Sequence, residues 1–237
     1  AGVEKAVLLG WYWEQPETCH WHNNDMAHWI REAPDRFIAF ASIQPSASTT
    51  GILEELERTA DRGFRGVGEL HPGIQGFDSR SEGWLTIANW CTERGWPVNF
   101  HATESVGPPH LGNIPTPLSD FVAMAEQHPK LKIILSHWGG GLGFFEQNPQ
   151  IREALKNVYY DSAASPLLYE PGVFRKMADL VGVDKLLYGS DYPLRIYPRR
   201  HKQAEFQTFL ESIRNESGLH PNELKQVLGE NFRSLFA

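Results

Sequence analysis

Short apolar runs alternate along this chain with segments of helical period, and this alternation constrains the fold more than any other feature. In most of the connecting segments the apolar residues fall three or four positions apart, as they do on one face of a helix. Strands that alternate with helices predict an α/β fold, in which helices cover a parallel sheet. Seven runs are expected to be strands: residues 5–9, 37–43, 66–70, 98–102, 132–136, 158–162 and 185–188.

The expected helices have end signals of their own. Gly63, Gly95 and Gly182 stand just past three of them, where a helix C-cap favours a residue that tolerates positive φ. A complete (β/α)8 barrel has eight strands, one more than the runs supply. We therefore expect a single domain over residues 1–237, a (β/α)8 TIM barrel whose first strand is absent or replaced by another element. The expected helices are residues 52–62, 84–94, 118–127, 149–155, 173–180, 205–213 and 222–236.

Charge and cysteine content exclude several classes of protein. The formal net charge is −7, and the short basic cluster at residues 199–202 is too small for a nucleic-acid surface. No apolar run approaches the roughly 20 residues of a membrane helix. Cys19 and Cys91 lie far apart without CxxC spacing, so they predict free thiols in a reducing compartment. We expect a cytoplasmic protein that acts on a small molecule and binds neither nucleic acid nor membrane.

Four expected strands end in residue types that bind metals. Glu69, His101, His137 and Asp191 each stand at or just after the end of an apolar run. In a barrel the catalytic groups project from the C-terminal ends of the strands, so these side chains are expected at one rim. Imidazole and carboxylate suit zinc and similar divalent ions, and water on such an ion has its pKa lowered toward 7. The sequence thus predicts a divalent metal site, with zinc as the expected ion.

The segments around these residues resemble amidohydrolase family 2, the relatives of aminocarboxymuconate-semialdehyde decarboxylase. The most specific matches are Ile-Leu-Ser-His-Trp-Gly-Gly-Gly at 134–141 and Leu-Leu-Tyr-Gly-Ser-Asp-Tyr-Pro at 186–193. Weaker matches are Val-Asn-Phe-His-Ala at 98–102 and Gly-Glu-Asn-Phe-Arg-Ser-Leu-Phe at 229–236. The resemblance extends over essentially the whole chain.

The resemblance implies a role for each matched residue. His101 becomes a metal ligand, and Asp191 a ligand or the carboxylate that takes a proton from metal-bound water. His137 orients and polarises the substrate or acts as acid and base. Glu69 is less typical of the subgroup, but its Val-Gly-Glu-Leu setting is similar to TatD-like barrels, where a glutamate helps to hold metal. The alternative is that Glu69 pairs with Arg65 or caps the next loop.

One departure from the family pattern concerns the first strand, which in the family carries a His-x-His pair of metal ligands. No such pair precedes Lys5. His20 and His22 form a His-Trp-His sequence, but they follow the first expected strand in what we expect to be a polar, aromatic loop. The pattern therefore predicts either a further strand upstream or a barrel that binds metal weakly or not at all.

Residues beside the matched motifs are candidates for contact with substrate. Trp138, Tyr192 and Arg195 are expected at the barrel mouth, where an arginine can bind a carboxylate by a bidentate pair. The alternative for the arginine is a solvated charge on a loop. The glycines at 139–141 are expected to permit a close backbone approach, and Asp161 to act behind the site.

Three functions fit this sequence. The first is a hydrolase that attacks an ester, lactone or amide of a small, carboxylated molecule through metal-activated water, with Asp191 as proton acceptor. The second is a metal-dependent, non-oxidative decarboxylase of an aromatic or unsaturated acid, because fold and motifs do not separate the two chemistries. The third is a catalytically silent barrel that serves as a binding or structural subunit. The resemblance also allows a homodimer.

Overall fold

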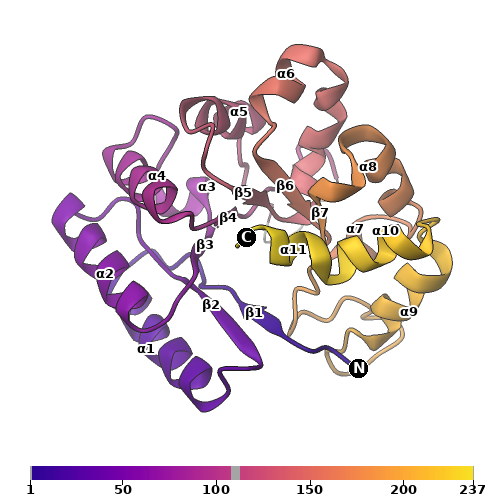
Figure 1. The fold of residues 1–237 in the computed structure, drawn as a ribbon, viewed down its shortest axis with the longest axis horizontal. Helices are drawn as coiled ribbons and strands as arrows, with labels where there is room; N and C mark the ends of the chain where they lie inside the picture. Colours follow the sequence, from indigo (N-terminus) through magenta and orange to yellow (C-terminus); the bar gives the residue numbers. More distant parts are fainter. Residues whose placement is uncertain (1, 108–112, 237) are drawn as a thin grey trace.

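The computed structural model describes residues 2–107 and 113–236, and it contains all seven expected strands. The strands form one sheet in the order β1 to β7, and every neighbouring pair is parallel. Helices lie around the outside of the curled sheet (Figure 1). The strands are β1 (Ala6–Leu8), β2 (Phe37–Ala41), β3 (Gly66–Leu70), β4 (Val98–Phe100), β5 (Ile133–Leu135), β6 (Val158–Asp161) and β7 (Leu186–Leu187).

The helices agree with the expected segments, with one exception that is treated below. Glu223 closes the start of α10, because its Oε2 accepts the backbone N–H of His220 at 2.8 Å. The helices at expected positions are α2 (Thr49–Asp61), α4 (Glu82–Arg94), α5 (Leu118–Gln127), α6 (Pro149–Ala154), α8 (Val173–Val181), α9 (Gln207–Glu216), α10 (Pro221–Lys225), η3 (Gln226–Glu230) and α11 (Asn231–Ser234). Three short helical turns are α3 (Pro72–Gln75), α7 (Ser165–Leu168) and η2 (Val183–Lys185). The longer segment η1 (His137–Gln147) is interrupted by left-handed backbone near its start.

The segment after β1 is helical, and the expectation of a loop there was wrong. α1 (Pro16–Glu32) runs for 17 residues. Its buried side chains are Cys19, Asn23, Met26 and Ile30, so they follow one another at intervals of four, three and four along one face. Proline also favours the first helical position, where its missing N–H has no partner to lose. The polar and aromatic residues between the buried positions concealed this stripe.

Side chains of alternate strand residues form two separate hydrophobic cores. Ala39 and Ala41 of β2 face the helices and belong to the large core, whereas Phe40 between them faces the inside of the barrel. Within the barrel, Phe40 packs with residues of other strands and with Phe232 and Leu235 at the C-terminal end of the chain. The last helix therefore fills part of the barrel interior.

The barrel is open along one side. β1 and β7 are the two edges of the sheet, and no ladder joins them among the residues described. α11 lies beside β7 in this region (Figure 1). The expectation of a barrel with one strand missing is confirmed, and the C-terminal helix is the element that partly occupies the gap.

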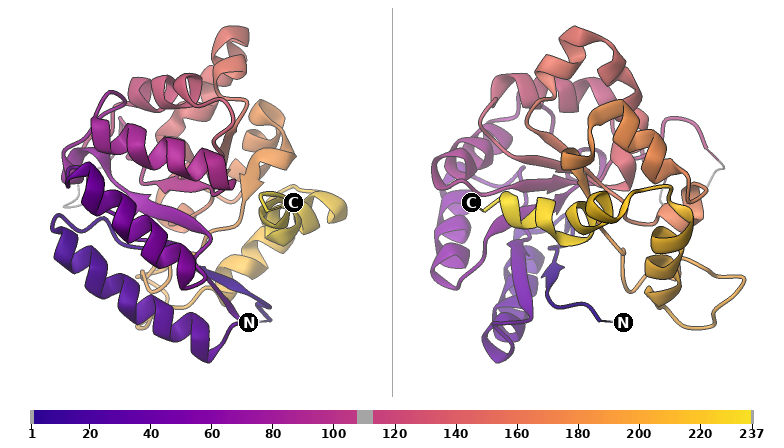
Figure 2. Two further views of the ribbon diagram at one scale, coloured as in Figure 1. Left: turned by 60° about the vertical axis from the view of Figure 1, so that its left-hand side comes forward. Right: turned by 45° about the vertical axis from the view of Figure 1, so that its right-hand side comes forward.

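Polar networks attach the helices to one another. Glu55 of α2 accepts hydrogen bonds from Asn23 Nδ2 at 2.6 Å and Arg58 Nε at 2.7 Å, and it pairs with His20. Burial by itself would raise the pKa of Glu55, but the hydrogen bonds from Arg58, Asn23 and His20 outweigh it, so that the pKa is lowered. This network joins α1 to α2, and α4 lies beside α2 on the same flank of the sheet (Figure 2).

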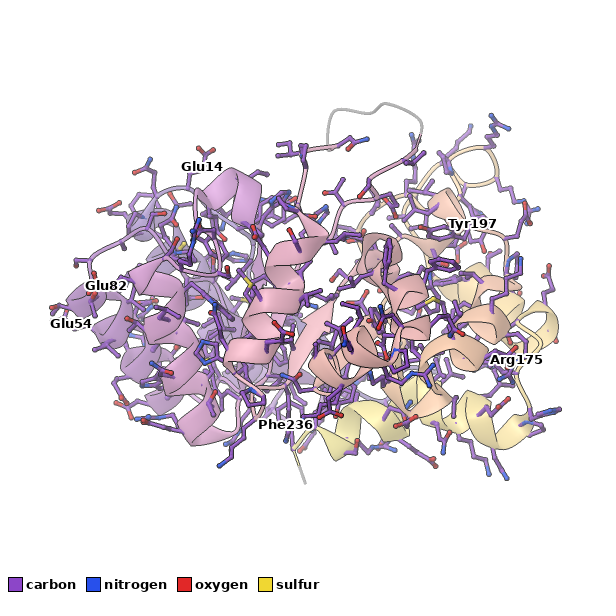
Figure 3. The ribbon with its side chains drawn as sticks, turned by 90° about the horizontal axis from the view of Figure 1, so that it is seen from above. Glu14, Glu54, Glu82, Arg175, Tyr197 and Phe236 are labelled. Carbon is purple, nitrogen blue, oxygen red and sulfur yellow. The ribbon has the colours of Figure 1, made fainter. Side chains whose placement is uncertain are left out.

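A buried ion pair ties η1 to the sheet. Lys185 Nζ lies 2.8 Å from Glu146 Oε2, and Tyr160 Oη donates to Glu146 Oε1 at 2.7 Å. Charged side chains also lie at both ends of the molecule, with Glu54 and Glu82 at one end and Arg175 at the other (Figure 3). None of the described helices combines the length and the apolar character that crossing a bilayer requires.

Candidate metal centre

Three side chains meet where β3, β4 and β5 end. His101 Nδ1 lies 2.9 Å from Glu69 Oε1 and 3.2 Å from His137 Nε2, and His137 Nε2 lies 3.8 Å from Glu69 Oε1. Tetrahedral ligands at about 2.0–2.1 Å from a zinc ion would be separated by roughly 3.3–3.4 Å. The three distances bracket that separation, so this donor set fits a divalent ion.

The hydrogen bonds of His137 leave the correct nitrogen free for a metal. Its Nδ1 lies 3.0 Å from the carbonyl oxygen of Ala163, which only accepts hydrogen bonds. We therefore assign the proton to Nδ1, and Nε2 presents its lone pair toward His101 and Glu69. A ligand histidine whose other nitrogen donates to a carbonyl is the usual arrangement in metal sites.

The charges of the three groups support one another. Burial would raise the pKa of Glu69, but the hydrogen bond from His101 and the nearby imidazoles outweigh it and lower the pKa. Burial would lower the pKa of His137, yet the carboxylates of Glu69, Asp161 and Asp191 outweigh it and raise the pKa. The site thus concentrates negative charge around two imidazoles, as a cation site requires.

Asp191 lies at the same rim, just after β7. Its φ of 58° places a non-glycine residue in the left-handed region, which turns the chain sharply at the strand end. Burial raises the pKa of Asp191, and the charges of Glu69 and Asp161 add to the rise, while His137 opposes it. Its carboxylate is near the metal-binding atoms but is not one of the three that converge. The predicted double role as ligand and proton carrier remains a prediction.

Two residues that were not predicted from the sequence adjoin the site. His71 is buried and caps α3, with Nδ1 accepting from the Ile74 N–H at 3.3 Å. Its ring stacks on that of His101 at 4.8 Å, and burial followed by the charge of His101 lowers its pKa to about 4. Tyr12 packs edge-on against the imidazoles of His71 and His101, and it lines the same cavity as the three converging side chains. Tyr12 follows β1 as the ligands follow their strands, but the aromatic run around it hid this signal.

Of the three residues predicted to contact substrate, Tyr192 lines the cavity, whereas Arg195 and Trp138 do not. Tyr192 is exposed and lines the cavity, together with Trp11, Leu167 and Leu194. Arg195 is exposed and lies outside the cavity lining. Trp138 is in the core and not at the mouth, since its ring packs against Phe174 and its Nε1 donates to Ser165 Oγ at 3.0 Å.

The glycines after Trp138 behave as expected. A Cβ on Gly140 would lie 2.5 Å from the carbonyl oxygen of Thr103, two residues after His101. Gly139, Gly140 and Gly141 all have positive φ. The glycine run therefore lets the backbone of η1 approach the end of β4 closely, beside the ligands.

The His-Trp-His sequence lies outside the centre, on α1. His20 pairs with Glu55, and His22 Nδ1 accepts from Trp13 Nε1 at 2.9 Å. Glu69 contacts His101 and His137, so the alternative of a pair with Arg65 does not describe its surroundings.

Comparisons with known proteins find relatives of this chain in one family. A family model described as Amidohydrolase matches residues 4–237. The chain is 24% identical to the 2-amino-3-carboxymuconate-6-semialdehyde decarboxylase of Dictyostelium discoideum, over 79% of this chain and 60% of that protein. It thus spans less than two thirds of this curated relative.

Solved structures share the fold at low sequence identity. A 5-carboxyvanillate decarboxylase from Novosphingobium aromaticivorans, solved with manganese, has a TM-score of 0.74 at 18% identity, covering 99% of this chain and 76% of that chain. A TIM-barrel protein from Bordetella bronchiseptica has a TM-score of 0.71 at 19% identity, covering 100% of this chain and 78% of that chain. The fold is accordingly that of a TIM barrel with one strand missing.

Proposed function

Because this chain belongs to the amidohydrolase family, we propose that it catalyses the metal-dependent, non-oxidative decarboxylation of a small carboxylic acid. The observation that carries the proposal is the convergence of Glu69, His101 and His137 within metal-binding distance at the rim where Asp191 also lies. The decarboxylases among its relatives and structural neighbours favour this reaction over the hydrolysis expected first.

Glu69 Oε1, His101 Nδ1 and His137 Nε2 would hold the ion. When bound, a divalent ion supplies a Lewis acid that binds and polarises an oxygen of the substrate. Zinc remains the identity that the nitrogen and oxygen donors favour. Manganese is the alternative, because it accompanies the decarboxylase of Novosphingobium aromaticivorans.

Asp191 would move the proton. Decarboxylation breaks a C–C bond, releases carbon dioxide and requires one proton on the carbon left behind. Burial and neighbouring carboxylates raise the pKa of Asp191, so that its protonated form is accessible nearer to neutral pH than that of an ordinary aspartate. Asp191 then donates to carbon and is reprotonated from solvent at the cavity mouth.

The cavity wall indicates the shape of the substrate. Trp11, Tyr12 and Tyr192 contribute aromatic surfaces to it, and Leu167 and Leu194 contribute aliphatic ones. Flat, apolar walls favour an aromatic or conjugated acid, because offset or edge-on contact with a ring adds to the energy of burial. The carboxylate of such an acid would point toward the metal centre.

Hydrolysis is the second candidate, and the presence of two carboxylates favours it. Glu69 contributes to the converging donor set, and this leaves Asp191 free to accept a proton from water, as a hydrolase requires. An ester, lactone or amide would then replace the acid as substrate. The two candidates share every residue named here and differ in the product formed.

Metal loading followed by product analysis tests the proposal. The purified protein is dialysed against zinc or manganese, bound metal is measured by mass spectrometry, and hydroxybenzoates, unsaturated acids, esters and lactones are assayed. Carbon dioxide release from an acid, abolished by a chelator, is expected. Metal-dependent cleavage of esters without carbon dioxide release would favour hydrolysis, and absence of bound metal would favour a silent barrel.

Two variants and a control examine the assigned residues. His101→Ala and Asp191→Asn should each abolish turnover while circular dichroism stays unchanged, because both side chains lie at the rim and outside the main core. His101→Ala should also lose metal, whereas Asp191→Asn tests whether this carboxylate is a ligand, a proton carrier or both. Asp35→Asn, on the exposed surface, should leave activity unchanged. Full activity in Asp191→Asn would contradict the proton-transfer role.

A further inference from the structure

We propose that Asp161 is a positioning residue that fixes His137 in the orientation and tautomer of a metal ligand. This inference rests on the proposed metal site, which it deepens, since Asp161 itself belongs to none of the three converging ligands. The sequence places Asp161 at the end of β6, and its side chain is buried behind the site.

Both carboxylate oxygens of Asp161 are engaged. Oδ1 accepts the backbone N–H of His137 at 3.3 Å and that of Ala163 at 2.9 Å. Oδ2 accepts from Ser136 Oγ at 2.9 Å and Asn99 Nδ2 at 3.3 Å. These donors come from three successive strand ends, those of β4, β5 and β6. One acceptor-only group therefore joins the strands that carry His101 and His137 to the loop after β6.

The contacts of Asp161 control the position of His137 from two sides. On one side, Asp161 holds the backbone N–H of His137, a residue whose φ of 56° is unfavourable for a non-glycine side chain. On the other side, it holds the N–H of Ala163 in a tight turn in which Ala164 also has positive φ. The carbonyl of Ala163 then receives the Nδ1 proton of His137.

The consequence is a defined direction for the ligand atom. With the backbone of His137 and the Ala163 carbonyl both fixed, the imidazole is held by its main chain and by Nδ1. Nε2 is then left 3.2 Å from His101 Nδ1, without a proton. Without Asp161, both N–H groups would lose their acceptor, and the left-handed turn at His137 would lose the bond that offsets its strain.

Two substitutions remove different parts of this network. Asp161→Ala removes all four acceptor contacts. Asp161→Asn keeps one oxygen, which can continue to accept from the two backbone N–H groups while its amide donates to the Ser136 hydroxyl. The asparagine variant should therefore rescue much of the function, as a positioning role through the backbone requires.

Metal affinity is the first readout, measured by equilibrium dialysis of the whole chain against zinc. Asp161→Ala should bind zinc about 10–100-fold more weakly than the unsubstituted protein, the usual loss when a group behind a metal ligand is removed. Asp161→Asn should fall between the two, and the surface control Asp35→Asn should match the unsubstituted protein. An affinity in Asp161→Ala within about twofold of the unsubstituted value would overturn the inference.

The imidazole tautomer is the second readout, and it needs neither metal nor turnover. Long-range ¹⁵N–¹H spectra of the metal-free protein, at a pH where the imidazoles are neutral, should show His137 protonated at Nδ1. Asp161→Asn should keep this tautomer, and Asp161→Ala should give a mixture. If Asp161→Ala does not fold, a tautomer mixture in Asp161→Asn together with unchanged zinc affinity overturns the inference.

The two readouts separate this inference from the proposed function. Unchanged affinity and tautomer in Asp161→Ala would refute the positioning role and leave metal-dependent decarboxylation intact. Zinc bound with the expected loss in Asp161→Ala, but without any carbon dioxide release from acids, would support the positioning role and refute the decarboxylation. Failure of the unsubstituted protein to bind zinc or manganese would refute both.

Discussion

Gly140 provides a stringent test of the geometry beside the metal centre, because its neighbour Gly141 is a nearly matched control. Both glycines have positive φ, 59° and 92°, so alanine is strained at either position. They differ in the space available. A Cβ on Gly140 would lie 2.5 Å from the Thr103 carbonyl oxygen, whereas a Cβ on Gly141 would have no atom within 4 Å.

The expected losses in stability follow from the backbone strain at positive φ and from the space around the added Cβ. Left-handed backbone costs an alanine about 1–2 kcal/mol, and the reduced entropy of the unfolded chain returns about 0.4–1 kcal/mol of this. Gly141→Ala should therefore lower the free energy of unfolding by at most about 1.6 kcal/mol. Gly140→Ala adds the displacement of a backbone carbonyl in a packed region, typically about 1–3 kcal/mol. The difference between the two variants isolates this contact.

Urea and thermal unfolding, followed by circular dichroism, measure that difference. In a domain of this size, 1 kcal/mol corresponds to roughly 2–4 °C in Tm, so Gly140→Ala should melt at least a few degrees below Gly141→Ala. Gly140→Ala should also weaken zinc binding, because Thr103 follows His101 by two residues. Equal stability of the two variants would refute the close approach of η1 to the end of β4.

Three further outcomes are expected. Lys185→Met leaves the buried Glu146 carboxylate without its cation and should lower the free energy of unfolding in urea by about 3–5 kcal/mol. Adding Glu146→Gln should recover much of the loss. Equal effects of the single and double changes would contradict the pairing. Glu55 has a lowered pKa in the folded state, so its contribution to the free energy of unfolding is present above the unfolded pKa of about 4.3 and is lost as pH falls through the folded value. Glu55→Gln should flatten the dependence of stability on pH in this acidic range. An unchanged dependence would argue against the Glu55 network. Zinc or manganese at a hundredfold excess over its Kd should raise the free energy of unfolding by about 2.7 kcal/mol, with reversal by a chelator, and no rise in Tm would count against the site.

Periodicity predicted most of the architecture because it is a local property. A parallel strand buried on both faces has a continuous apolar run such as Ile133–Leu135, and the expected strand 132–136 exceeds the observed one by one residue at each end. α1 was not predicted because histidines, tryptophans and other polar residues separate its four buried residues. The buried residues have helical spacing, but the polar and aromatic residues between them obscure the pattern.

The sequence predicted most residues of the candidate site, but only part of their spatial arrangement. Strand ends selected Glu69, His101, His137 and Asp191, because parallel strands deliver their C-terminal ends to one rim. His71 and Tyr12 were missed, since their contacts with His101 depend on how a turn and a loop pack above the strands. Trp138 was expected at the mouth, but the left-handed backbone at 137–141 turns its ring into the core.

The sequence by itself determined which residue types stand at which strand ends, because a strand ends where its apolar run ends and nothing distant is needed to fix that point. Only the tertiary structure decided that Oε1, Nδ1 and Nε2 of three separate segments face one another, that Asp161 accepts the backbone N–H groups of His137 and Ala163, and that α11 enters the open barrel. Those outcomes depend on side-chain directions and on contacts between residues far apart in the chain, and such contacts leave no periodic trace in the sequence.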